Sequence, residues 1–449
     1  MLQANQRIGL VFFPAFDWAI DPSHPEREER LLYTRDQIVE EGLLDLPGVI
    51  ELRPRLATPA EVQRAHICVP DVAAQATHSH RIAAGGCIVA ADAVLERRVE
   101  RSFALLRPPG HHAMRIVHGC RGFCNINNEA IMIEHIRQKY GGHLKIAVVD
   151  TDAHHADGSQ DIYYNDPDVL HLCIHQDGRT LYPGTGDLNE LGGPGAFGLT
   201  LNVPLPPGSG DRELLYVIEH LALPVLADFK PDILINGAGQ DNHYSDPLTD
   251  MRVTAGGYAR LTELLNPDIV VLEGGYSIEG ALPYVNLGII LALAGLDYSE
   301  VREPDWQPAL NDDNRPVHPA VREAVEYLLE IWRQRADIDL NRLFGKGPFF
   351  ERNRRIYYDT DQIEEEQSEE IRRCPACSGY RVIHSRASKG YGPERRIAAV
   401  LIPRHACAEC RGAAAETFAR LTPGAALQYV YLQDPEQDRF EIKSRADKK

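Results

Sequence analysis

A short apolar run near the middle of the chain ends abruptly in acidic and imidazole side chains. Residues 146–149 are all apolar, which predicts a strand buried on both faces of a parallel sheet. Asp150, Asp152 and His154 follow at alternate positions, so an extended backbone would point them to one side. Carboxylate and imidazole groups both bind zinc, and a catalytic zinc takes three protein ligands with one position left open. Asp152 and His154 are therefore predicted as two ligands of a metal site that needs a third.

An isolated Asp-x-His pair is more often an exposed acidic turn, so the prediction depends on what the other strand ends carry. Three further apolar runs also end in such groups: residues 103–106 before His111 and His112, residues 231–236 before Asp241, and residues 267–272 before Tyr276. The carboxyl ends of parallel strands meet at one edge of a sheet, where ligands bind. Four such ends favour a catalytic site over four unrelated turns, and Asp241 is the predicted third ligand.

Five motifs occur in a specific order and spacing: Arg107-Pro-Pro-Gly-His-His-Ala113, Gly122-Phe-Cys-Asn-Ile-Asn-Asn128, Asp150-Thr-Asp-Ala-His-His-Ala-Asp-Gly158, Leu181-Tyr-Pro-Gly-Thr-Gly186 and Glu273-Gly-Gly-Tyr276. Together they resemble the zinc-dependent histone deacetylase family, in its class II-like bacterial branch. The resemblance runs from about Arg7 to Leu296. It implies the arginase/deacetylase fold, an α/β architecture with a single parallel sheet of about eight strands flanked by helices.

The residue types also predict how such a site would work. Bound zinc lowers the pKa of its water to about 7, and His111 and His112 would stand beside that water as general base and general acid. The resemblance implies that Asp150 pairs with His111 and Asp157 with His112. Tyr276 would donate its hydroxyl to the developing oxyanion. The alternative for Tyr276 is a buried packing role, which the strand end and the preceding Gly-Gly make the weaker interpretation.

The resemblance further implies a substrate channel and additional cations. Phe123 and Tyr182 match positions whose rings enclose the acetyl-lysine stem, and Gly122 lines the same channel. Leu248 matches a position that is glutamate in members preferring acetylated polyamines, so an acyl-lysine protein or peptide is the favoured substrate. Monovalent cation sites, occupied by K⁺, are also implied, one of them using Asp150, Asp152 and His154 with backbone oxygens near Cys173 and Ile174.

Two Cys-x-x-Cys pairs stand apart near the end of the sequence. Cys374 and Cys377 precede Cys407 and Cys410 by 29 intervening residues. This pattern predicts a structural zinc held by four thiolates, which soft sulfur ligands favour. A redox dithiol pair, a disulfide and a bound iron are the alternatives.

Charge divides the chain unevenly. The formal net charge is -18, whereas residues 371–449 carry 15 Lys or Arg and 8 Asp or Glu. We expect a deacetylase catalytic domain over residues 1–350, an acidic linker over 351–370 and a small zinc-ribbon-like domain over 371–449. The basic domain could bind nucleic acid or an acidic partner, or could dock against the acidic catalytic domain.

The whole sequence predicts an intracellular, cytoplasmic zinc hydrolase. No apolar segment approaches the ~20 residues of a membrane span, and the start lacks the pattern of a signal peptide. Two other functions remain open. One is the same chemistry on a small molecule such as an acetylated polyamine; the other is a non-catalytic binding protein that acts through the zinc ribbon.

Overall fold

The computed structural model describes residues 3–311 and 315–444. Its centre is a sheet of eight parallel strands in the order β2-β1-β4-β10-β9-β6-β7-β8. The strands are β1 Ile8–Phe13, β2 Val49–Leu52, β4 Arg101–Leu106, β6 Ile146–Asp150, β7 Val169–Gln176, β8 Thr200–Leu205, β9 Ile233–Ala238 and β10 Ile269–Leu272. The predicted α/β fold with one large parallel sheet is confirmed.

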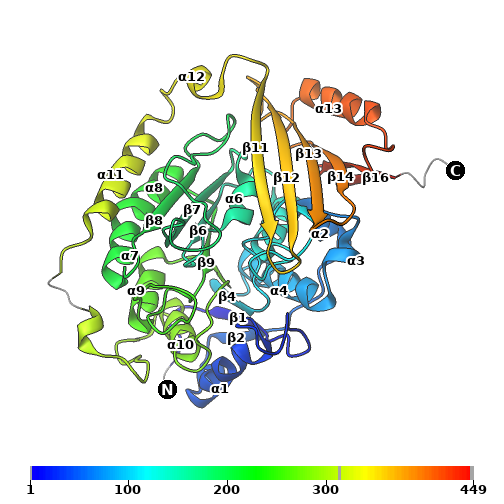
Figure 1. Ribbon diagram of the computed structural model, residues 1–449. Helices are drawn as coiled ribbons and strands as arrows, with labels where there is room; N and C mark the ends of the chain where they lie inside the picture. Colours follow the sequence, from blue (N-terminus) through cyan, green and yellow to red (C-terminus); the bar gives the residue numbers. More distant parts are fainter. Residues whose placement is uncertain (1–2, 312–314, 445–449) are drawn as a thin grey trace.

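Helices cover both faces of this sheet (Figure 1). One face packs against α2 Pro59–Ala65, α4 His78–Leu95 and α5 Asn128–Tyr140. The other packs against α1 Leu32–Glu40, α7 Asp211–Val217, α8 Leu223–Phe229, α9 Ala255–Leu265, α10 Leu282–Leu293 and α11 Pro319–Gln334. Within residues 3–311 and 315–444, no helix is both long and apolar enough to cross a membrane.

Burial on both faces explains the unbroken apolar runs. In β6, Ile146 and Val148 contribute to the core beneath α4 and α5, whereas Ala147 and Val149 contribute to the core on the other side. Successive side chains of a strand point to opposite faces, so every position of such a strand must be apolar.

The four strands predicted to end in functional groups are neighbours in the sheet. Strands β4, β10, β9 and β6 lie side by side, and the segments that follow them start at the same edge. The catalytic domain also has short elements: α3 Val72–Gln75, α6 Asp157–Tyr163, and the two-stranded sheet of β3 Ile67–Cys68 with β5 Ile116–Val117. Adjacent strand ends bring side chains from distant parts of the sequence together.

A second sheet of six strands follows the catalytic domain and lies beside it, coloured yellow to red in Figure 1. Its strands are β11 Phe349–Tyr358, β12 Ile363–Arg372, β13 Arg381–Lys389, β14 Arg395–Leu401, β15 Tyr429–Asp434 and β16 Arg439–Ser444. Neighbouring strands are antiparallel except β14 and β15, which are parallel and connected through α13 Ala408–Arg420. The short helix α12 Leu340–Phe344 precedes the sheet.

The acidic linker predicted over residues 351–370 is wrong, because these residues belong to strands β11 and β12. Burial alternates along β12 as in any half-buried strand, but its buried face includes Glu365, Gln367 and Glu369. Those side chains pair with arginine, histidine and serine rather than with apolar groups. The alternation is therefore invisible in the hydrophobic pattern, and the C-terminal sheet begins near Phe349 rather than at residue 371.

The C-terminal sheet packs on the catalytic domain through apolar and ionic contacts. Ile67, Val69 and Ile116 form a buried cluster with side chains of β13, β14 and β15. Asp161 of α6 accepts hydrogen bonds from Arg354, and Arg352 lies within ion-pair distance of the same carboxylate. Buried ion pairs of this kind require good geometry to offset desolvation, which fixes how the two sheets meet.

Glu369 is a buried carboxylate paired with Arg352 and Arg381 inside the C-terminal sheet, and its behaviour with pH provides a test. Burial raises its pKa, but the charges of Arg352 and Arg381 outweigh burial and lower it to about 2 from 4.5. The carboxylate therefore stabilises the fold fully above about pH 4.5, and its contribution is lost as the pH falls toward 2. Glu369→Gln should lower the free energy of unfolding by roughly 3 kcal/mol at pH 7.

Urea unfolding of the variant and the parent between pH 3 and pH 8 measures this difference. The gap between the two proteins should narrow as the pH falls below 4.5. Glu364→Gln, on the exposed face of the same strand, is the matched control and should unfold like the parent. A constant gap across the range would contradict the proposed ionic role.

Candidate active site

Three predicted metal ligands lie together at the edge of the central sheet. Donor atoms of Asp152, His154 and Asp241 all fall within 4.8 Å of one another, and all three residues are buried. His154 Nδ1 lies 2.8 Å from Asp241 Oδ2 and 3.2 Å from Asp152 Oδ1. The segment after β6 is tied to the segment after β9, because the N–H of Ala153 donates to Asp241 Oδ1 at 2.8 Å. The two strand ends thus assemble one donor set.

The electrostatics of these residues fit a bound cation. Asp152 and Asp241 are fully buried, and within the described chain no lysine or arginine pairs with either carboxylate. Burial and the charge of Asp152 both raise the pKa of Asp241. Burial lowers the pKa of His154, but the nearby carboxylates, Asp241 foremost, outweigh it and raise the pKa to about 10. A nitrogen and two carboxylates that hold excess negative charge are a suitable donor set for zinc.

Each of the two adjacent histidines is held by a buried carboxylate. His111 Nδ1 lies 3.2 Å from Asp150 Oδ2, and His112 Nδ1 lies 2.8 Å from Asp157 Oδ1. The other ring nitrogen of His111, Nε2, is 3.8 Å from Asp152 Oδ2. Burial lowers the pKa of His112 to about 3, reinforced by the neighbouring His111. The pKa of His111 is raised despite burial, by the charges of Asp152 and Asp150.

The loop that carries the histidine pair depends on residues to which the sequence analysis assigned no role. Glu273, at the end of β10, accepts hydrogen bonds from the N–H of His111 at 3.0 Å and from the preceding N–H at 2.7 Å. Arg107 forms a two-fold hydrogen bond with the buried Glu26, at 2.7 and 2.6 Å. Arg30 donates to the backbone oxygens of Glu273 and Gly275. Such two-fold arginine–carboxylate pairs fix orientation as well as charge.

Tyr276 and Leu248 are joined through one carboxylate. Asp246 accepts the N–H of Tyr276 at 2.7 Å with one oxygen and the N–H of Leu248 at 2.9 Å with the other. The ring of Tyr276 is 8 % exposed, and it meets the ring of Phe123 edge to face at 5.5 Å between centroids. The guanidinium of Arg30 lies 5.0 Å from the centre of the tyrosine ring. Asp246 is thus a further positioning residue that the sequence analysis missed.

The predicted channel residues gather beside the histidine pair. The ring centroid of Tyr182 lies 5.3 Å from that of His112 and 6.4 Å from that of His154. Gly122 has φ +50°, and a Cβ at this position would collide with the imidazole of His112. Phe123 follows with φ +67° and packs against Tyr276. Glycine at 122 therefore allows the backbone to approach the imidazole closely.

Arg121 connects this site to the C-terminal sheet. Its guanidinium donates to Asp157, the partner of His112, and to the backbone oxygen of Tyr357 in β11. Burial raises the pKa of Asp157, but the charge of Arg121 outweighs burial and keeps that pKa well below its ordinary value. Since Tyr357 lies in the segment predicted as a linker, the sequence gave no signal for this contact.

The four cysteines of the two Cys-x-x-Cys pairs come together in the C-terminal sheet. Their sulfur atoms lie within 4.8 Å of one another, with Cys374 Sγ 3.8 Å from Cys407 Sγ. Zinc–sulfur bonds of about 2.3 Å place sulfurs about 3.8 Å apart in a tetrahedron. All nine cysteines are free in this structure. The N–H groups of Ala376, Gly379 and Cys410 point at the sulfurs at 3.4 Å each, an arrangement that favours thiolates.

A third cluster joins the two parts of the molecule but is poorly arranged for a metal. His143, Asp168 and His405 offer donor atoms within 4.8 Å of one another. The two imidazoles are stacked with centroids 3.4 Å apart and planes 12° apart, so their lone pairs do not converge. His405 Nε2 already lies 2.7 Å from the oxygen of Gly142. This cluster is a packing contact between the C-terminal sheet and the catalytic domain.

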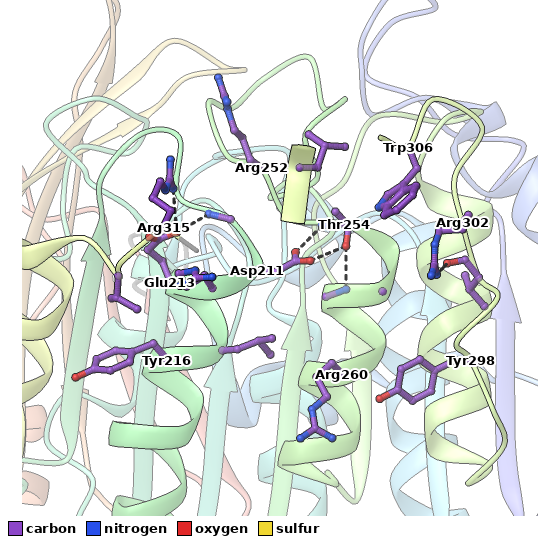
Figure 2. A pocket seen from close by; sticks show the side chains of 18 of the residues that line it. Asp211, Glu213, Tyr216, Arg252, Thr254, Arg260, Tyr298, Arg302, Trp306 and Arg315 are labelled. Atoms are coloured by element: carbon purple, nitrogen blue, oxygen red, sulfur yellow. Dashed lines mark hydrogen bonds and ion pairs between the residues drawn. The ribbon is translucent and has the colours of Figure 1, made fainter. Parts of the chain in front are cut away.

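A cavity of about 730 Å³ is separate from the candidate site, and none of the predicted site residues line it (Figure 2). It lies beside the starts of α7 and α9, and several of its polar groups already have partners. The pairs are Asp211 with Thr254, Glu213 with Arg315, and Arg302 with Trp306. Contacts among its own side chains thus account for several of the polar groups that line this cavity.

Comparisons with known proteins agree with this geometry. The family model described as "Histone deacetylase domain" matches residues 69–286. A protein named "Probable deacetylase" from Archaeoglobus fulgidus is 42 % identical over 311 residues, which cover 63 % of this chain and 85 % of that protein. "Histone deacetylase-like amidohydrolase" from Pseudomonas aeruginosa is 36 % identical over 233 residues, covering 50 % of this chain and 60 % of that protein.

A solved structure supports the same assignment. The crystal structure of the HDA15 HD domain superposes with a TM-score of 0.63 and 28 % identity, covering 74 % of this chain and 95 % of that domain. The fold is therefore that of a deacetylase catalytic domain. The chain belongs to the histone deacetylase family. The family match ends at residue 286, so the six-stranded C-terminal sheet lies outside it.

Gly274 provides a test of the metal site. A Cβ at this position would collide with carboxylate oxygens of both Asp241 and Asp152. Gly274→Ala should therefore displace these carboxylates and weaken the affinity of this site for zinc by at least about tenfold. Metal titration measured by calorimetry on purified full chain gives the affinity.

Gly256→Ala is the matched control, because its nearest neighbour would be 3.7 Å from the added carbon. Its position inside α9 makes alanine neutral or slightly stabilising. Unchanged zinc affinity in Gly274→Ala would show that Asp152 and Asp241 do not hold the metal.

Proposed function

We propose that this protein is a zinc-dependent hydrolase that removes acetyl or other acyl groups from lysine side chains of proteins or peptides. The observation that carries the proposal is the buried donor set of Asp152, His154 and Asp241 beside two histidines that are each held by a carboxylate. Zinc bound by this set would polarise the amide carbonyl and supply an activated water.

The protein's own groups are placed to move protons and to stabilise charge. His111 and His112 use Nδ1 to contact carboxylates, so Nε2 is the nitrogen of each ring that would take or give a proton. Nε2 of His111 lies 3.8 Å from Asp152 Oδ2. We assign Tyr276 to donate its hydroxyl to the developing oxyanion, an interaction worth about 3 to 4 kcal/mol in comparable sites. Its ring is fixed between Phe123 and Arg30, which favours one orientation of the hydroxyl.

An acyl-lysine substrate fits the lining of the site. Phe123 and Tyr182 offer aromatic surfaces to an apolar lysine stem, and burial there disfavours a free ammonium. Leu248 provides no counter-charge for the second amine of a polyamine. The names of the plant and bacterial relatives, "Histone deacetylase 15" and "Histone deacetylase-like amidohydrolase", point to the same substrate class.

The C-terminal sheet is assigned a structural zinc, held by the four cysteines. Contacts of its arginines support docking on the catalytic domain: Arg354 binds Asp161 and Arg404 binds Glu134. The assembled catalytic set makes a purely non-catalytic binding protein the weaker alternative. Binding of nucleic acid or an acidic partner, the K⁺ sites and a cytoplasmic location stay predictions.

Tyr276→Phe tests the proposed chemistry. The variant should lose about 10²- to 10³-fold in kcat on an acetyl-lysine peptide, because one oxyanion donor is removed, while zinc content stays the same. Tyr431→Phe, whose hydroxyl contacts only the backbone of Pro70 in the interface, is the control and should keep its activity. Wild-type kcat in Tyr276→Phe would remove the tyrosine from the mechanism.

The same assay with acetylspermidine separates the two substrate classes. The peptide should have the higher kcat/KM for the parent protein, and Leu248→Glu should shift the preference toward the polyamine. A parent protein that prefers acetylspermidine would overturn the assignment of acyl-lysine as the substrate, but the assignment of hydrolase activity would stand.

A further inference from the structure

The turn between β11 and β12 reaches the predicted substrate channel. Oδ1 of Asp359, in this turn, accepts a hydrogen bond from the N–H of Gly122 at 2.8 Å and from the hydroxyl of Tyr182 at 3.1 Å. Gly122 follows β5 and Tyr182 follows β7, so the two channel walls come from separate loops. One carboxylate oxygen of the C-terminal sheet therefore ties the two walls together.

Residues next to Asp359 in the chain contact the same loop of the catalytic domain, residues 116–122. Asp361 Oδ2 accepts the N–H of Cys120 at 2.6 Å, and Tyr358 donates its hydroxyl to the backbone oxygen of Ile116 at 2.9 Å. Arg121 bridges the backbone of β11 to Asp157, the carboxylate that holds His112. The segment from 116 to 122 is thus supported along its length by the hairpin.

The loop needs such support because its backbone is strained. Arg121 and Cys124 exchange two backbone hydrogen bonds, at 3.0 and 2.8 Å, which close a tight turn around Gly122 and Phe123. Both central residues have positive φ, +50° and +67°. Glycine adopts this conformation freely, but a bulky aromatic residue there is unfavourable by roughly 1 kcal/mol or more. An external acceptor for the N–H of Gly122 helps to hold Phe123 in this position.

We propose that Asp359 is a positioning residue for the acyl-lysine channel, so that the C-terminal sheet completes the active site. The inference rests on the proposed lysine deacylase function, and it concerns a part of the chain outside the matched family domain. Asp359 contacts neither the metal ligands nor the histidine pair within the described residues. It fixes the positions of Tyr182 and Phe123, and these positions determine the affinity for the lysine stem of the substrate.

A residue that only positions the channel walls should affect KM and leave kcat nearly unchanged. Removing the carboxylate leaves the hydroxyl of Tyr182 and the N–H of Gly122 without this partner and relaxes both walls. Binding of the stem should weaken, whereas the acid–base groups keep their contacts. Asp359→Ala should therefore raise KM for an acetyl-lysine peptide about five- to tenfold, with kcat within about twofold of the parent.

The experiment compares Asp359→Ala, Asp359→Asn and Asp438→Ala in the full zinc-loaded chain. Asparagine retains an oxygen acceptor and should recover most of the affinity lost in the alanine variant. Asp438 is the matched control, since it also links the C-terminal sheet to the catalytic domain, through Arg64 at 2.7 and 2.9 Å. Its alanine variant should keep the KM of the parent.

Peptide binding in a Tyr276→Phe background, measured by calorimetry, gives an independent reading. Asp359→Ala should weaken the Kd there by the same factor as it raises KM. If the alanine variant does not fold, Tyr182→Phe, which removes one of the two hydrogen bonds, should raise KM about threefold.

The outcomes distinguish the two proposals. A parent protein that does not hydrolyse any acyl-lysine peptide would overturn the proposed function. An active parent with unchanged KM in Asp359→Ala, or in Tyr182→Phe where that variant replaces it, would overturn the positioning role alone. A KM increase of equal size in Asp438→Ala would also overturn it, because docking of the sheet would then explain the effect.

Discussion

The structure depends on negative charge that is buried at the edge of four adjacent parallel strands. Asp150, Asp152, Asp241 and Glu273 are each fully buried there. Burying carboxylates without partners is strongly unfavourable, so each must be matched by a cation or by hydrogen-bond donors. Histidine rings and backbone N–H groups satisfy part of this requirement. The proposed zinc would match the remaining negative charge, and the proposed chemistry follows from its binding there.

Around these carboxylates, arginine side chains contact the loops that carry the proposed catalytic residues. Arg107 fixes the segment leading to the histidine pair through Glu26, and Arg30 holds the backbone before Tyr276. Arg121 does the same for Asp157 and extends the support to the C-terminal sheet. The catalytic groups therefore stand on short loops whose positions are fixed by buried ionic contacts.

The sequence was informative about strands whose buried faces are apolar and uninformative about a strand whose buried face is polar. Strands such as β6 and β9 were predicted because both of their faces are apolar, and their order along one edge assembled the donor set. The hairpin of β11 and β12 was missed because Glu365 is buried against His118, far away in the sequence, and Glu369 is buried against arginines of the neighbouring strands. The role of Asp359 was out of reach for the same reason, since only the folded contact with Tyr182 reveals it.

Anomalous diffraction at the zinc absorption edge, from crystals of the full active chain, tests the central claim most directly. The account predicts two peaks. One lies among Asp152, His154 and Asp241, and the other lies among the four cysteine sulfurs of the C-terminal sheet. Protein that hydrolyses an acetyl-lysine peptide yet gives no peak at the first position would contradict the claim that buried carboxylates at this edge hold a catalytic metal.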